Sequence, residues 1–247
     1  CQRRRSHPSG HAVRTLAHRR LPVVLALLAA MLLPWPAHAQ GPAKHPAAAY
    51  GQLPLIFEAT TGQTDPAVKF LSRGPGYTLF LTPTEAVLAL AKPSADGSAS
   101  EATVLRMKLV GANSAPRVSG VEALPGKVNY FIGNDPAQWR TNIPTYAKVK
   151  YESVYPGVDL VYYGSQGRLE YDFVVAPGTD PKSIALTFEG ADKLRLDAQG
   201  DLVIQTAGGE LRLRKPLVYQ EVDGARKPIA GDYILKSQNQ VGFQVAA

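Results

Sequence analysis

From Tyr50 onward the hydrophobic and polar residues of the chain alternate in short runs, with scarcely a helical period. Such alternation is typical of half-buried β-strands. Runs at 76–91, 104–112 and 193–214 are separated by Pro, Gly or Asp turn signals, and Asp223-Gly224 predicts a two-residue hairpin. The pattern predicts an all-β fold with little helix, an antiparallel β-sandwich built as one large sheet system or as two packed small ones.

The cleanest alternation lies in VDLVYYGSQGRLEYDFVV, residues 158–175. A turn centred on Ser165-Gln166 predicts a hairpin with one wholly apolar face, which we expect to be core. On that face the predicted pairs are Tyr162 with Leu169, Leu160 with Tyr171, and Val158 with Phe173. On the other face they are Tyr163 with Arg168, Val161 with Glu170, and Asp159 with Asp172.

The second face gathers three carboxylates, Asp159, Glu170 and Asp172. Like charges directly opposite one another destabilise a strand pair, so we expect a compensating group. The favoured interpretation is a surface charge network with Lys148 and Lys150 of a neighbouring strand. Two others stay open: a weak site for a hard cation such as Ca²⁺, and the two-carboxylate site of a glycosidase.

Aromatic and turn-forming residues meet in GNDPAQWRTNIP, residues 133–144. Asp135-Pro136 and Ile143-Pro144 predict a turn-rich connection. Trp139 and Arg140, with Asp135 and Tyr163, are the candidate ligand-binding residues, because an exposed indole can form a platform for sugars or peptides. Alternatively, and this is the interpretation we favour, Trp139 caps the open end of the sandwich.

The amino-terminal segment differs from the rest of the chain. A basic stretch, the apolar run LPVVLALLAAMLLPW and the small-residue motif AHA predict a secretory signal peptide over residues 1–39. Residues 40–49 form a Pro/Ala linker, and residues 50–247 form the β-domain. Its last residues, QVAA, read as an interrupted strand, and we expect the domain to be truncated before further sequence.

Removal of that signal changes the function classes that remain. Six of the 27 Lys and Arg residues and none of the 20 Asp and Glu precede Gln40, which leaves 21 bases against 20 acids, a net charge of +1. Nucleic-acid binding therefore loses its electrostatic basis. Cys1 lies in the signal, and His45 is the one histidine after it, so cysteine- or histidine-based catalysis and zinc sites are not expected.

Four stretches, residues 62–88, 129–164, 169–204 and 215–233, resemble an N-terminal domain of unknown function found before seven-bladed β-propeller-type repeats in large exported bacterial proteins. The resemblance covers nearly all of residues 50–247 in order. It implies that propeller repeats follow this segment, and it brings no catalytic residues. One departure is Thr60, which stands where the family pattern FE-x-N-x-GQ has Asn.

These observations predict a non-catalytic, secreted or cell-surface β-domain, without a cofactor, that packs against or presents a propeller repeat region of the same chain. The alternatives are a carbohydrate-binding module built on Trp139, and a glycosidase-like enzyme built on Asp159, Glu170 and Asp172. Extracellular polysaccharide or protein are the expected outside partners. We expect no nucleic acid and no membrane span after signal cleavage.

Overall fold

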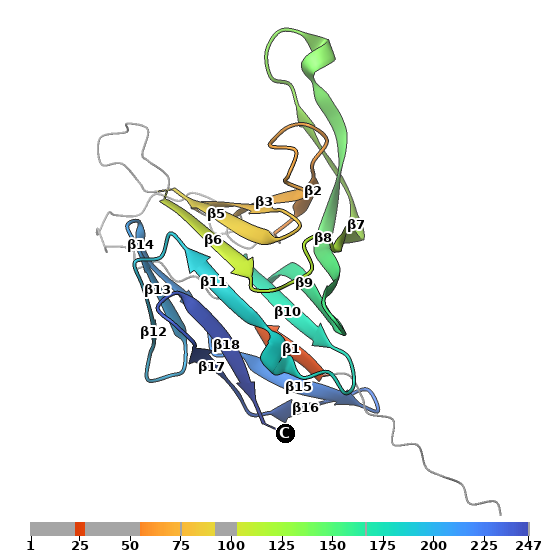
Figure 1. Ribbon diagram of the computed structural model, residues 1–247. Helices are drawn as coiled ribbons and strands as arrows, with labels where there is room; N and C mark the ends of the chain where they lie inside the picture. The colour runs from red at the N-terminus through yellow and green to blue at the C-terminus, as the bar shows by residue number, and fades with distance from the viewer. Residues whose placement is uncertain (1–22, 28–54, 75, 92–102, 166, 247) are drawn as a thin grey trace, which may run out of the picture.

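A computed structural model describes residues 23–27, 55–74, 76–91, 103–165 and 167–246 (Figure 1). They form an almost purely antiparallel β structure with two short 3-10 helices, η3 (Pro136–Gln138) and η4 (Pro181–Ser183). The prediction of an all-β sandwich-type fold is therefore confirmed. In this part of the chain, no helix has the length and apolar character needed to span a bilayer.

One long sheet carries most of the structure. Its strands are hydrogen-bonded in the order β16-β15-β1-β10-β9-β8-β2-β3-β4-β5-β6-β11-β18-β17, and β7 also pairs with β8. The bounds are β1 (Val23–Leu27), β2 (Phe57–Ala59), β3 (Phe70–Gly74), β4 (Tyr77–Leu81), β5 (Glu85–Leu90), β6 (Thr103–Leu109), β7 (Arg117–Tyr130), β8 (Arg140–Tyr155), β9 (Val158–Ser165), β10 (Arg168–Val175), β11 (Ala185–Glu189), β15 (Leu217–Val222), β16 (Ala225–Ile229), β17 (Gly231–Leu235) and β18 (Gln240–Val245).

A second, three-stranded sheet packs against the long one. It contains β12 (Lys193–Leu196), β13 (Leu202–Thr206) and β14 (Gly209–Leu213), in that order. Ile204 and Leu211 from this sheet share one apolar cluster with Leu88, Tyr171 and Phe188 of the long sheet. The core thus lies between facing sheet layers, as in a sandwich.

A chain of aromatic rings runs through this core. Its members are Tyr151, Tyr162, Tyr171, Phe173, Phe243 and Tyr233, and successive ring centroids lie 5.5–6.0 Å apart. All six side chains are buried. The predicted apolar face of the 158–175 hairpin is therefore confirmed as core.

Turn chemistry sets two of the strand boundaries, and the predicted Asp223-Gly224 hairpin is confirmed. Asp223 and Gly224 have φ of +52° and +78° and join β15 to β16, with Val222 opposite Ala225. Both positive φ values suit the two-residue turn that Asp-Gly favours. Likewise, Gly157 (φ +74°) closes the tight turn between β8 and β9.

The predicted register of the 158–175 hairpin is wrong by two residues. The structure pairs Ser165 with Arg168, and it places Tyr162 opposite Tyr171. Gly167 occupies the left-handed position of the turn, with φ of +75°. Glycine adopts this conformation more easily than Ser165 or Gln166, the residues on which the turn was predicted to centre. Because the shift is even, both faces keep their residues, but Asp159 lies opposite Val174 and not opposite Asp172.

Strands β7 and β8 extend beyond the rest of the sheet as a two-stranded arm with η3 at its tip (Figure 1). Pro144 was expected to mark a turn, but it lies within β8, opposite Lys127. The β7–β8 register shifts between Ala123 and Lys127. A proline is tolerated beside such an irregularity, where a ladder hydrogen bond is already missing.

The predicted signal peptide and linker lie largely outside the described residues. The exception is Val23–Leu27, which forms β1 and pairs with both β10 and β15. Thr60, the position of the expected departure from the resembling domains, donates its hydroxyl hydrogen to the Val68 carbonyl and so ties the β2–β3 connection together.

Candidate functional site

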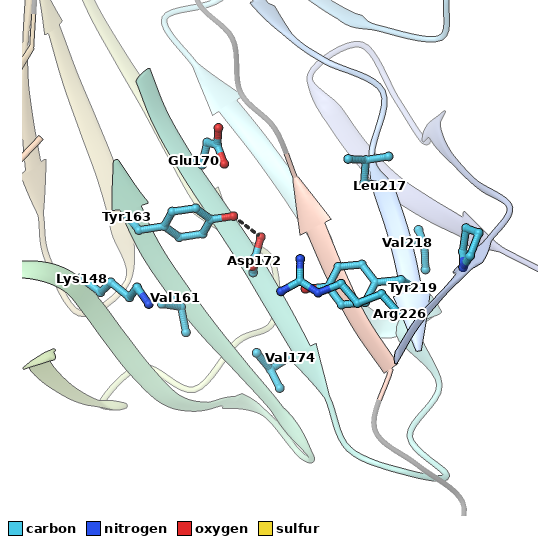
Figure 2. Close-up of a pocket in the computed structure, with 11 residues that line it drawn as sticks. Lys148, Val161, Tyr163, Glu170, Asp172, Val174, Leu217, Val218, Tyr219 and Arg226 are labelled. Carbon is cyan, nitrogen blue, oxygen red and sulfur yellow. Dashed lines mark hydrogen bonds between the residues drawn. The ribbon is translucent and has the colours of Figure 1, made fainter. Parts of the chain in front are cut away.

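An open trough lies on the outer face of the long sheet, across β8, β9, β10, β15 and β16 (Figure 2). Its volume is about 610 Å³. The lining residues are Lys148, Val161, Tyr163, Glu170, Asp172, Val174, Leu217, Val218, Tyr219, Arg226 and Pro228. It therefore contains two of the three candidate carboxylates and one candidate ligand-binding residue.

The acidic side of the trough is organised by Tyr163. In the β9–β10 register Tyr163 stands opposite Glu170, and its hydroxyl donates to Asp172 Oδ1 at 3.0 Å. Burial, together with the negative charges of Asp172 and Glu170, raises the pKa of Tyr163 well above its ordinary value. The phenol therefore stays protonated and acts as a hydrogen-bond donor to the carboxylates.

The opposite side of the trough is basic and aromatic. The Arg226 guanidinium lies over the Tyr219 ring, 4.5 Å from its centroid, and its Nε is 3.6 Å from Glu221 Oε1. Figure 2 shows Arg226 reaching back across Tyr219 toward the middle of the trough. A ligand lying in the trough would meet carboxylates along β10 and a stacked guanidinium on β16.

Asp159 is separated from the other two carboxylates. Its Oδ2 is 3.0 Å from Lys150 Nζ, and its Oδ1 accepts a hydrogen bond from the Ser153 backbone N–H at 2.8 Å. Lys148 instead pairs with Glu122 at 2.5 Å. The expected lysine network therefore forms around Asp159 through Lys150, whereas Glu170 and Asp172 are organised by Tyr163.

The three carboxylates considered for a cation do not form one set. Across the ranges that the structure describes, no three His, Cys, Asp or Glu side chains come together in a way that could hold a metal ion. Glu170 and Asp172 share one face of β10 and lie about 6.6–6.8 Å apart along it. Glu170 is buried, which limits its access from the trough.

Trp139 does not cap the sandwich, which corrects the interpretation favoured from the sequence. The indole lies at the tip of the arm, where its ring centroid is 5.1 Å from that of Phe131 in an edge-on arrangement. Its Nε1 donates to the Gly133 carbonyl at 3.2 Å. The long β7–β8 pair carries this loop away from the core, so the ring packs within its own loop.

The other two loop candidates have local roles. Asp135 caps η3, because its Oδ1 accepts from the Ala137 N–H at 2.9 Å. Arg140 donates from Nη1 to the Gln138 carbonyl at 3.2 Å. Tyr163 lies in the trough, on a different part of the sheet from the tip. The four predicted ligand-binding residues are thus divided between two surfaces.

The tip is the most apolar exposed feature of the arm. The side chains of Phe131 and Ile132 are 62% and 67% exposed. They precede Trp139 in the same loop, and the Phe131 ring packs edge-on against its half-buried indole, so the end of the projecting element is apolar. Exposed apolar clusters of this kind mark contact surfaces.

A buried polar cluster that the sequence did not reveal holds the arm against the body of the domain. Glu58 on β2, only 5% exposed, accepts from Arg73 Nη1 and from the Tyr130 hydroxyl, each at 2.5 Å. The Arg73 guanidinium also lies 5.5 Å from the centroid of the Tyr130 ring. Because Tyr130 ends β7, this contact fixes the distal half of the arm.

One sequence signal pointed toward that cluster. Glu58 interrupts the otherwise apolar run LPLIFEA, residues 53–59, and a charge inside a short apolar strand needs a partner. The partners could not be chosen from the sequence, because Tyr130 is 72 residues away and reaches Glu58 only through the folding back of the arm.

Comparison with protein-family models matches residues 57–247 to a family described as "Domain of unknown function (DUF7948)". Neither the curated proteins nor the solved structures contain a match to the chain. The match spans every described strand from β2 to β18, together with the trough and the arm.

Proposed function

The chain belongs to the DUF7948 family of domains of unknown function, and on that premise we propose that it is a non-catalytic, exported β-domain. It packs against or presents a β-propeller-type repeat region of the same polypeptide. The β7–β8 arm makes the contact, through Phe131, Ile132 and Trp139.

The observation that carries this proposal is the combination of a braced arm with an apolar tip. Phe131 and Ile132 expose more than 60% of their side chains, while Glu58 ties the arm to β2 and β3 through Tyr130 and Arg73. A contact surface held on a rigid support loses little conformational entropy on binding. The resemblance to domains that precede propeller repeats supplies the identity of the partner.

Calorimetric unfolding of a longer polypeptide that includes the repeats tests this function. A partner that binds only the folded domain raises the domain's melting temperature. The double variant Phe131→Ser/Ile132→Ser should abolish that increase, while leaving the melting of residues 1–247 alone unchanged. Leu235→Ser, at a 43% exposed position on β17, is the control and should keep the increase. An increase that persists in the double variant contradicts the proposal.

Carbohydrate binding is the second function, favoured by the aromatic pair at the tip. It predicts that a polysaccharide panel retains the wild-type chain and releases the Trp139→Ala variant. If no polysaccharide in the panel retains the wild-type chain, carbohydrate binding is ruled out. A glycosidase reaction at Glu170 and Asp172 predicts hydrolysis that Glu170→Gln and Asp172→Asn each abolish, and no turnover across a panel of glycosides rules that out.

A further inference from the structure

The long sheet contains a slot one strand wide between β10 and β15. In the structure β1 fills it, with Leu25 opposite Phe173 on one side and opposite Val218 on the other. Because β1 is antiparallel to both neighbours, β10 and β15 run parallel to each other. Two inter-strand spacings separate them, about 9.6 Å, so they do not pair with each other in this structure.

The strand in the slot comes from the part of the chain predicted to be removed. Val23–Leu27 lie within the apolar run of the predicted export signal, which ends at Ala39. A chain cleaved there keeps β10 and β15 but loses the strand between them. Residues 171–175 and 217–220 would then face each other with unpaired backbone N–H and C=O groups, an arrangement that buried backbone does not tolerate.

The walls of the slot are part of the core. Phe173 and Val175 on β10 have no exposed surface, and Val218 on β15 is 4% exposed. An empty slot would open this apolar interior to water. On the outer side the slot runs along the floor of the trough, between Asp172 on β10 and Arg226 on β16 (Figure 2).

We propose that the slot between β10 and β15 is a strand-acceptor site, which takes an extended apolar segment of a partner polypeptide once the export signal has been removed. The segment has at least five uncharged residues, contains no proline and runs antiparallel to both neighbours. Main-chain hydrogen bonds on both sides supply the affinity, as in strand-addition complexes. This inference rests on signal removal and does not rest on the arm.

The occupied slot itself indicates the chemistry of the partner. The occupant VVLAL has only aliphatic side chains. Its backbone forms ladders with five residues of β10 and four of β15. A proline would delete one of these hydrogen bonds wherever it stood, because each amide of a doubly paired strand belongs to one of the two ladders.

A second copy of this chain is a poorer occupant than a different polypeptide. The described strands with one sheet neighbour are β7, β12, β14, β16 and β17. Each is already paired along one edge, whereas the slot requires a strand that is free on both edges. Within the described part of the chain, a second copy could offer only its own β1.

A disulfide in the full chain tests the slot without disturbing it. In a Cys1→Ser background, Val24→Cys and Val174→Cys place the new thiols at directly opposed positions of β1 and β10. We expect a disulfide under mild oxidation, and its absence would overturn the inference. A soluble peptide with the sequence of residues 23–28 flanked by lysines should lower the disulfide yield when added in excess before oxidation. The same peptide with Pro at the Leu25 position should not.

Peptide binding to a variant with a vacated slot is the second measurement. Leu25→Pro in the full chain should bind the fluorescent lysine-flanked peptide at least tenfold more tightly than the unaltered chain does. Ala30→Pro, beyond β1, is the control and should bind like the unaltered chain. Equal affinity for all three chains would overturn the proposal. Dimerisation of the Leu25→Pro chain without peptide binding would also overturn it, since the vacated slot would then not accept the peptide.

Discussion

The arm should loosen and the domain should lose stability when the charge of Glu58 is removed. Glu58→Gln keeps the shape of the side chain, but it replaces a buried carboxylate that accepts two hydrogen bonds by a neutral amide. Glu122→Gln is a matched control on the same arm. Glu122 pairs with Lys148 at 2.5 Å, which is also the Arg73–Glu58 distance, but the Glu122 side chain is 55% exposed and that of Glu58 is 6% exposed.

The magnitude follows from that difference in burial. A hydrogen bond to a buried charged group contributes about 1.5–3 kcal/mol, which applies to the Tyr130 contact. The Arg73 contribution is smaller, about 0–1 kcal/mol, because the Arg73 side chain is 50% exposed and its charge is screened by water. Since the amide can still accept from Tyr130, we expect Glu58→Gln to lower the free energy of unfolding by about 1–2 kcal/mol. Glu122→Gln should cost less than about 0.5 kcal/mol.

Urea unfolding followed by circular dichroism measures the stability, and hydrogen exchange measures the arm. Exchange should accelerate at residues 127–130 and 140–143 in Glu58→Gln, and it should stay unchanged at β10. If Glu58→Gln and Glu122→Gln have equal effects on stability, burial does not set the strength of this pair. If exchange in the arm is unaltered, Glu58 does not brace it. Either result refutes the reasoning.

Three further predictions concern the core and the arm. Phe173→Ala should lower the free energy of unfolding by about 3–5 kcal/mol, because Phe173 is fully buried between Tyr171 and Phe243. The control Phe131→Ala should lower it by less than about 0.5 kcal/mol. Equal losses of stability for the two variants in urea titrations would contradict the assignment of the core. Gly120→Ala should cost about 1–3 kcal/mol, since a Cβ there would lie 2.4 Å from the Tyr146 ring, whereas Gly126→Ala meets no atom within 4 Å and should be tolerated. Burial raises the pKa of Tyr77 to about 12, so the folded state holds this proton more tightly than the unfolded state does. Stability should therefore fall as the pH rises above about 10, and Tyr77→Phe should flatten that fall; an unchanged slope between pH 10 and 12 would contradict it.

Much of the fold could be predicted because its signals are local. The alternation in 158–175 identified a buried face that contains Tyr162 and Phe173, and Asp223-Gly224 placed a hairpin correctly. The register of the first hairpin could not be predicted as reliably. Ser165-Gln166 and the turn containing Gly167 differ by an even shift, and alternation determines only the parity of a register.

The candidate site was harder to predict because it depends on contacts between distant segments. The prediction that Trp139 caps the sandwich rests on the usual burial of large aromatic side chains, and no local pattern indicates that β7 and β8 continue past the sheet as an arm. The predicted register placed Asp159 opposite Asp172, whereas the structure places Asp159 opposite Val174. Glu58 and Tyr130 meet only after the arm folds against β2. Nothing in the sequence around either residue indicates the other as its partner.

Hydrogen exchange at the arm tip tests the central claim most directly. A polypeptide that carries a β-propeller-type repeat region after residue 247, as proposed, is compared with the 247-residue chain over residues 131–139. A domain that packs against a repeat region through Phe131, Ile132 and Trp139 predicts slower exchange at the tip in the longer polypeptide, and restored exchange in its Phe131→Ser/Ile132→Ser variant. Identical exchange at the tip in the two wild-type proteins would contradict the claim that the arm is the contact surface.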